Sequence, residues 1–179
     1  MKIKINSGNF EACPEFTGQA VCVDVTPLRR QQSQYGERDV FKVVFEVDLA
    51  KADGGRYGVW SRNFTPSLNE KANFRKFLRG WFGRDLTKQE LENFDTETLI
   101  GRPAQVVVVH EHKDDEVYAN IAACTPDKSG EPLKASGKFV RAKDRQGTSV
   151  PANGAGAPST DTGAAGSGYR RAQQPPSDG

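Results

Sequence analysis

The sequence of 179 residues has little cysteine and no long apolar run, and both absences limit its class. Its three cysteines, Cys13, Cys22 and Cys124, are odd in number and include no CxxC pair, which argues against a zinc ribbon or a secreted disulfide scaffold. We expect them to be buried, as free cysteines usually are. No segment approaches the roughly 20 apolar residues of a membrane-spanning helix, and the N-terminal segment lacks the apolar stretch of a signal peptide. These features predict a cytoplasmic protein without membrane association.

The motifs of common enzymes are also missing. The sequence has no P-loop, no nucleophile elbow and no HExxH motif. His110 and His112 are spaced as two ligands on one strand face, but no third ligand lies at a diagnostic spacing. A metal-dependent nuclease that uses these histidines with nearby carboxylates is the enzymatic alternative. We expect no enzyme, no metal and no cofactor.

Large apolar residues become scarce towards the C-terminus. From Gly147 onwards glycine, alanine, serine, threonine and proline dominate, and such a segment cannot bury enough surface to offset its ordering entropy. We expect residues 147–179 to be disordered. Residues 129–146 are predicted to be a basic transitional segment with one apolar pair, Phe139 and Val140, and residues 1–128 to be the folded domain.

Alternating apolar residues predict five strands within that domain. The strands are expected at residues 19–28, 39–48, 57–64, 104–112 and 117–124. In the first, Val21, Val23 and Val25 fall on one face. In the second, Phe41, Val43, Phe45 and Val47 form an inward face, while Lys42, Glu46 and Asp48 form a solvent face.

Between the third and fourth strands the pattern changes to that of a helix. Phe74, Phe77, Leu78 and Trp81 recur at helical spacing, and Gly83 is suited to end the helix in the left-handed conformation. Capping-box patterns begin at Ser67 and Thr87, so we expect this helix to begin near Ser67 and a short second helix to begin after Thr87. Arg75, Lys76, Arg79 and Arg84 lie on the opposite side of the first helix.

The order β-β-β-α-β-β is the connectivity of the OB-fold, a small Greek-key barrel. We therefore predict an all-β domain, a five-stranded OB-fold barrel with one plugging helix, followed by a disordered C-terminal tail. The large aromatic face of the helix is what a plug at an open barrel end requires.

OB-folds commonly bind oligonucleotides across strands 2 and 3 and the flanking loops. The segment after the first strand holds Arg29, Arg30 and Arg38 around Tyr35, and cations near an exposed ring suit an unpaired nucleic acid. We expect this segment to be a long flexible loop. It is either an ordinary solvated loop or a nucleic-acid contact.

The third strand adds a second candidate group. Strand alternation places Trp60, Arg62 and Phe64 on one side. Trp60 either faces outwards beside Arg62 and Lys42 as a stacking platform or belongs to the core. Tyr118 is a surface aromatic that either stacks on a base or covers the barrel edge. Residues 114–116 are acidic and would repel phosphate near this surface.

Residues 63–126 resemble a family of phage-encoded OB-fold single-stranded-DNA-binding proteins from tailed-phage replication and recombination regions. The recurring features are an FTPSL opening, a GRxLTxxEL segment followed by FD, an LIG-plus-basic motif and YxxI. In this sequence they are residues 64–68, 83–91, 94–95, 99–102 and 118–121. The resemblance implies an OB-fold and a phage context, and no motif in it is itself a DNA-contact signature.

We therefore expect a single-stranded-DNA-binding protein without sequence preference that acts in phage replication or recombination, in the host cytoplasm. The predicted contact residues are Arg29, Arg30, Tyr35, Arg38, Lys42, Trp60, Arg62 and Tyr118. Replication or recombination proteins and a second copy of the chain are further candidate partners. The alternative is a protein-interaction module, either an adaptor in replication or recombination or an inhibitor of a host defence, that binds no nucleic acid.

Overall fold

The computed structural model describes residues 11–145, which are mostly β-structure. The predicted disordered tail, residues 147–179, lies outside the described residues. In chain order the elements are β1 (Phe16–Val25), β2 (Arg29–Ser33), β3 (Gly36–Val40), β4 (Val43–Ala50), β5 (Arg56–Trp60), α1 (Asn73–Phe82), α2 (Lys88–Glu92), η1 (Thr96–Leu99), β6 (Pro103–Lys113), β7 (Glu116–Thr125) and η2 (Ala142–Asp144).

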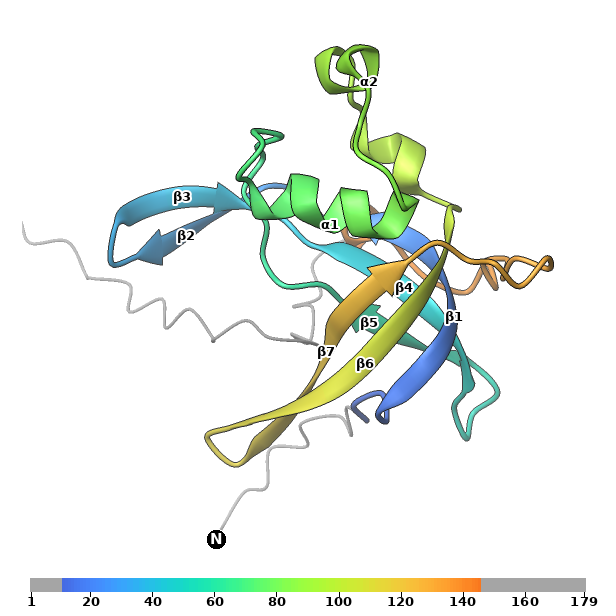
Figure 1. The fold of residues 1–179 in the computed structure, drawn as a ribbon. Coiled ribbons are helices and arrows are strands. Elements are labelled where there is room, and N and C mark those ends of the chain that lie inside the picture. Colours follow the sequence, from blue (N-terminus) through green and yellow to red (C-terminus); the bar gives the residue numbers. More distant parts are fainter. Residues whose placement is uncertain (1–10, 146–179) are drawn as a thin grey trace, which may run out of the picture.

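Five of these strands close into a barrel in the order β1-β4-β5-β7-β6 (Figure 1). Neighbouring strands are antiparallel, except that β5 and β7 pair in parallel at Trp60 and Asn120. The helix α1 comes between β5 and β6 in the chain and packs against β7. The predicted five-stranded barrel and the place of its helix in the chain are therefore confirmed.

The remaining strands, β2 and β3, form a separate hairpin that projects from the barrel (Figure 1). The prediction of a flexible loop here was wrong, because Arg29 pairs with Val40 and the register continues to Ser33 and Gly36. Gly36 has φ 101°, a conformation that glycine adopts at no steric cost, so the turn can be tight. The segment is almost entirely polar, so no apolar alternation marks its strands in the sequence.

The inward face predicted for residues 39–48 does line the barrel interior, both in β4 and at Phe41, which forms an isolated β-bridge with Phe64 just before β4. Phe41, Val43, Phe45 and Val47 are all buried in the main core cluster. The aromatic face of α1 joins them, and the rings of Phe45 and Trp81 lie 5.0 Å apart, edge to face. The helix therefore closes the core with its large side chains, as its apolar spacing predicts.

Much of the outer face of β1 and β4 is also buried, contrary to the prediction of a half-buried sheet, whereas Asp48 is exposed as predicted. Lys42 and Glu46, expected on a solvent face, are only 9% and 3% exposed. Val25 does not share a face with Val21, because the register between β1 and β4 shifts between Cys22 and Asp24 and turns Val25 into the main core. A bulge of this kind reverses the alternation beyond it.

What covers this outer face is the segment of residues 129–145, here called the strap. Its Leu133 and Phe139 pack against a second apolar cluster formed by Val21, Val23 and Val44. The composition of this segment predicted only a basic transition. Its two widely spaced apolar residues nevertheless match an apolar patch that would otherwise face water.

Two buried carboxylates on the outer face hold the strap. Asp24 accepts hydrogen bonds from Arg141 Nε at 2.9 Å and from the backbone N–H of Ala142 at 2.7 Å. Glu46 accepts them from the backbone N–H and the hydroxyl of Ser136, at 2.8 and 2.7 Å. Because buried charges need such partners, the strap is part of the folded structure.

The predicted helix signals differ in outcome. The capping box expected at Ser67 does not form, because α1 begins at Asn73 and its N-cap, Ala72, makes no side-chain cap bond. Gly83 ends α1 with φ 70° as expected. At Thr87 both bonds of the capping box are present, with Glu90 as the reciprocal partner.

Cys13, Cys22 and Cys124 are free and buried, as predicted. In the part of the chain that the structure describes, no helix is long and apolar enough to cross a membrane.

Candidate nucleic-acid interface

The β2–β3 hairpin separates its charges between two faces. Residues opposite each other in an antiparallel pair lie on the same face, and successive residues alternate between faces. The register therefore places Arg29 and Arg38 on one face, and Arg30, Glu37 and Asp39 on the other. Arg30 lies 3.4 Å from a Glu37 carboxylate oxygen and 3.6 Å from one of Asp39. Of the three predicted arginines in this segment, Arg30 is thus neutralised and the other two are not.

The face with Arg29 and Arg38 is tied to the barrel near the end of β5. On the same face, Gln31 is the register partner of Arg38, and its side-chain oxygen accepts a hydrogen bond of 3.0 Å from the Asn63 amide. The neighbouring Arg62 is exposed, with its guanidinium 6.0 Å from the centroid of the Phe64 ring. We group Arg29 and Arg38 of the hairpin with Arg62, which precedes Asn63 in the chain, and call these three arginines the cationic face. Within residues 11–145, no ion pair involves any of these three arginines.

Lys42 lies next to this face but is 9% exposed. Burial, followed by the positive charge of Arg29, lowers the pKa of Lys42 to about 8. Its charged form is therefore poorly solvated and repelled by a neighbouring cation.

The predicted aromatic contacts are not brought together. Tyr35 is at the tip of the β2–β3 hairpin and is 89% exposed. Tyr118 is half-buried on β7, and its hydroxyl donates a hydrogen bond to Glu116, which raises the pKa of the phenol. Tyr35 is free to meet a base, whereas Tyr118 is held beside a carboxylate.

Trp60 is half-buried on the outer face of β5, opposite Val44. Its ring lies 6.4 Å from that of Phe139 in the strap, at an interplanar angle of 56°. The predicted grouping of Trp60 with Phe64 was wrong, because β5 ends at Trp60 and Phe64 turns inwards to 1% exposure. Trp60 faces outwards, as the platform alternative proposed, but shares that face with the strap.

The β6–β7 hairpin projects from the same side of the barrel as β2–β3, towards the left of Figure 1. Its turn residues Asp114 and Asp115 both have positive φ, 50° and 64°, as the favoured two-residue turn of a hairpin requires. Glu111 accepts a hydrogen bond from Asn120 at 2.6 Å. This hairpin therefore presents an acidic tip, which would repel a phosphate backbone.

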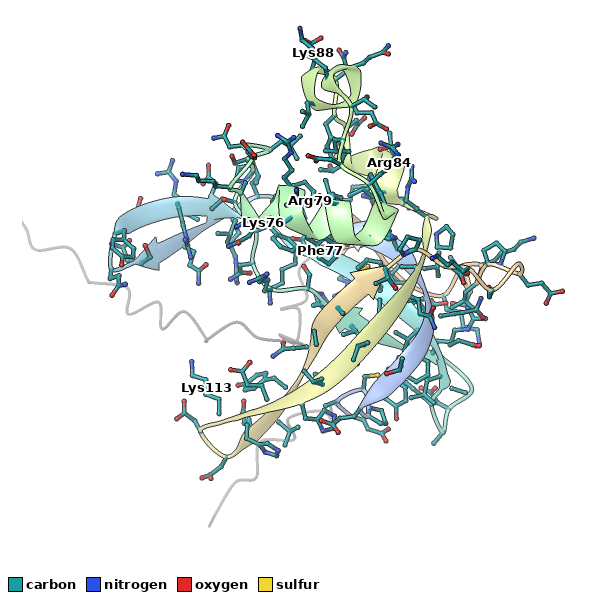
Figure 2. All side chains as sticks on the ribbon, viewed as in Figure 1. Lys76, Phe77, Arg79, Arg84, Lys88 and Lys113 are labelled. Atoms are coloured by element: carbon teal, nitrogen blue, oxygen red, sulfur yellow. The ribbon has the colours of Figure 1, made fainter. Side chains whose placement is uncertain are left out.

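The basic side of α1 is partly neutralised. Arg75 pairs with Asp85 at 2.9 Å, and Arg84 pairs with Glu90 at 2.7 Å. The hydrogen bonds from Arg84 and from the backbone N–H of Thr87 lower the pKa of Glu90 to about 2. Figure 2 shows Lys76 and Arg79 on α1, and neither belongs to an ion pair among residues 11–145.

The histidines do not form a metal site with neighbouring residues. His110 makes a 2.8 Å hydrogen bond through Nε2 to the carbonyl oxygen of Cys13. In the described range, residues 11–145, no group of three or more histidine, cysteine, aspartate or glutamate side chains could hold a metal ion.

Sequence reasoning missed the residues that the strap brings to this surface. Lys138, Phe139 and Arg145 line a pocket with Trp60, more than seventy residues away in the chain. The one signal in the sequence is the isolated apolar pair that includes Phe139. No model of a known protein family and no curated protein matches this sequence, so the family resemblance remains a prediction.

Proposed function

We propose that the protein binds single-stranded DNA without sequence preference and acts in phage DNA replication or recombination, and that its barrel is an OB-fold. The strand order β1-β4-β5-β7-β6 supports the OB-fold. An OB-fold is a five-stranded barrel, and here the core-packing helix α1 lies before the fourth barrel strand, followed by the short helices α2 and η1. The inserted β2–β3 hairpin then occupies the first inter-strand loop, which OB-folds use for ligand contact. The resemblance of residues 63–126 to phage proteins supports the biological context.

The observation that carries the proposal is the cationic face formed by Arg29, Arg38 and Arg62. Cations without carboxylate partners can exchange their counterions for phosphates, whatever the base sequence. Tyr35 extends beyond them on a hairpin and offers an exposed ring to an unpaired base. The arrangement supports contact with a flexible, unpaired strand.

The test is a titration of fluorescein-labelled oligo-dT, followed by anisotropy at several salt concentrations. We expect binding whose logarithmic affinity falls linearly with the logarithm of salt concentration. Arg38→Ala should weaken binding and reduce that salt slope by about 1, as loss of one phosphate contact does.

Arg30→Ala is the matched control, because Arg30 is on the same hairpin but faces Glu37 and Asp39. It should change affinity much less than Arg38→Ala. Equal losses for the two variants would show that the hairpin acts only through its net charge. Absence of binding by the wild-type chain at low salt would reject the proposed function itself.

A second candidate is a protein-interaction module, which the acidic β6–β7 tip favours. Asp114 and Asp115 are exposed and form no ion pair among the described residues. A basic protein partner would suit this tip better than DNA would. Capture of a replication protein that is lost in an Asp114→Ser/Asp115→Ser variant, without oligonucleotide binding, would favour this candidate.

A further inference from the structure

The strap and β5 enclose a pocket of about 410 Å³ on the outer face of the barrel. This volume lies within the range of small-molecule sites. Its lining includes Gly58 and Trp60 from β5, and Lys138, Phe139 and Arg145 from the strap. The pocket therefore exists only because the strap lies across the strand.

The floor of the pocket is aromatic. The rings of Trp60 and Phe139 meet at 56° with centroids 6.4 Å apart, so a planar group would lie against the pair and not between its members. Gly58 lets these rings lie close to the β5 backbone, because a Cβ there would be 3.3 Å from the Trp60 ring and 3.8 Å from the Phe139 ring. An unpaired nucleobase is a planar group of the kind that stacks on such rings.

Three carboxylates line the pocket, those of Glu11, Glu46 and Asp53, and each accepts a hydrogen bond. The Tyr57 hydroxyl donates to Glu11, which raises the pKa of Tyr57. Among the described residues, only Glu46 of the three also forms an ion pair, with Arg56. Glu46 accepts hydrogen bonds from Arg56 at 3.0 Å and from Ser136. The Asp53 side chain accepts one from the backbone N–H of Gly55 at 2.8 Å.

Two cations of the strap are not paired with carboxylates in the described range, although Arg145 Nε donates a hydrogen bond of 2.9 Å to the carbonyl oxygen of Val140. Neither Lys138 nor Arg145 belongs to an ion pair within the described part of the chain. Arg145 lies 5.2 Å from the centroid of the Phe139 ring. The pocket thus combines an aromatic floor with cations that can meet a phosphate.

We infer that the strap completes a pocket for one unpaired nucleotide of a bound DNA strand, with the base against Trp60 and Phe139 and the phosphate facing Lys138 and Arg145. This inference rests on the proposed function. Lys42 immediately precedes β4 and lies two residues before Val44, the register partner of Trp60. The DNA strand would run from the cationic face past Lys42 to Trp60, along the outer faces of β4 and β5.

The opposite role for the strap would be to cover Trp60 and block binding. The structure favours completion, because the strap is fixed by the buried carboxylates of Asp24 and Glu46, which would lose their partners if it left. A strap held at two buried charges is costly to displace. The two roles predict opposite effects on DNA affinity when Phe139 is replaced by a smaller residue.

The experiment measures labelled oligo-dT binding by the full chain and its Phe139→Ala and Lys138→Gln variants. We expect Phe139→Ala to weaken binding about tenfold, the loss typical of one base–aromatic stack. Lys138→Gln should weaken binding and lower the salt slope.

Intrinsic fluorescence is the second readout. The chain has two tryptophans, and only Trp60 is accessible, since Trp81 is 1% exposed. Oligo-dT should quench Trp60 in the wild type.

Lys88→Gln is the matched control, because Lys88 is an exposed cation on α2, away from the strap (Figure 2). Thermal unfolding of each variant verifies folding, and the exposed Lys138 keeps the test valid if Phe139→Ala is unstable. Tighter binding by Phe139→Ala would overturn the inference in favour of a blocking strap. Wild-type affinity in both strap variants, or DNA binding without quenching, would also overturn it and leave the proposed function standing. No binding by the wild type would instead reject the proposed function.

Discussion

Lys42 is the residue where burial and charge oppose each other most directly. Burial and Arg29 lower its pKa to about 8, from 10.5 in the absence of the fold. Between these pH values the unfolded chain binds more protons than the folded chain, so the free energy of unfolding should rise with pH. The penalty is fully present below pH 8 and is removed as the pH approaches 10.5, a gain of up to about 3 kcal/mol.

Urea unfolding of the wild type and Lys42→Met at pH 7.5 and pH 10 checks this prediction. The variant lacks the titrating group, so the difference in unfolding free energy between variant and wild type should shrink as the pH rises. Lys128→Met, at an exposed position, corrects for general effects of charge. An identical pH dependence in the wild type and Lys42→Met would contradict the assigned pKa.

At the same scale, the sequence predicted which residues carry charge but not which of them are neutralised. Arg30 and Arg38 look alike in the sequence, and only the strand register shows that Arg30 faces Glu37 and Asp39. Lys42 occupies a position in the strand alternation that is typical of a solvent-facing residue. The alternation looks the same whether or not a distant segment covers that face, so the burial of Lys42 could not be predicted.

At the scale of elements, two capping-box patterns in one chain have different outcomes. Thr87→Ala should destabilise the protein by about 1 kcal/mol, because it removes a cap bond that forms. Ser67→Ala should cost much less, because the Ser67 hydroxyl accepts only a local bond of 3.3 Å from Asn69 and caps no helix. Urea unfolding of both variants measures the difference. Equal losses in the free energy of unfolding for the two variants would contradict the start of α1 at Asn73.

The elements that were predicted well are those whose apolar pattern suffices by itself. Strands β4, β6 and β7 and the aromatic face of α1 follow from period and composition. The β2–β3 hairpin was missed because its residues are polar, so pairing there depends on the turn at Gly36 and not on an apolar face. The bulge in β1 was missed because nothing in a single strand marks where its partner slips register.

At the scale of the whole molecule, the barrel cannot be understood without its strap. The apolar residues Val21, Val23 and Val44 form a patch on the outside of the barrel, and the isolated apolar pair that includes Phe139 is the one sign in the sequence of what covers it. The pairing of that patch with Leu133 and Phe139 connects residues 89 to 118 positions apart. The cationic half of the candidate site was therefore predictable from local composition, whereas the half supplied by the strap was not.

The strap also decides where the folded unit ends. A chain of residues 1–128 would expose the Val21, Val23 and Val44 patch and leave Asp24 and Glu46 without the partners that Arg141 and Ser136 provide. Both carboxylates would then face water, so the loss comes from the exposed apolar patch and the lost hydrogen bonds, and we expect about 3 kcal/mol in the free energy of unfolding. A chain of residues 1–145 keeps these contacts and should unfold at the same urea concentration as the full chain. Equal stability of the 1–128 and 1–145 chains would show that the strap only rests on the barrel, and the nucleotide pocket that depends on it would then lack a fixed wall.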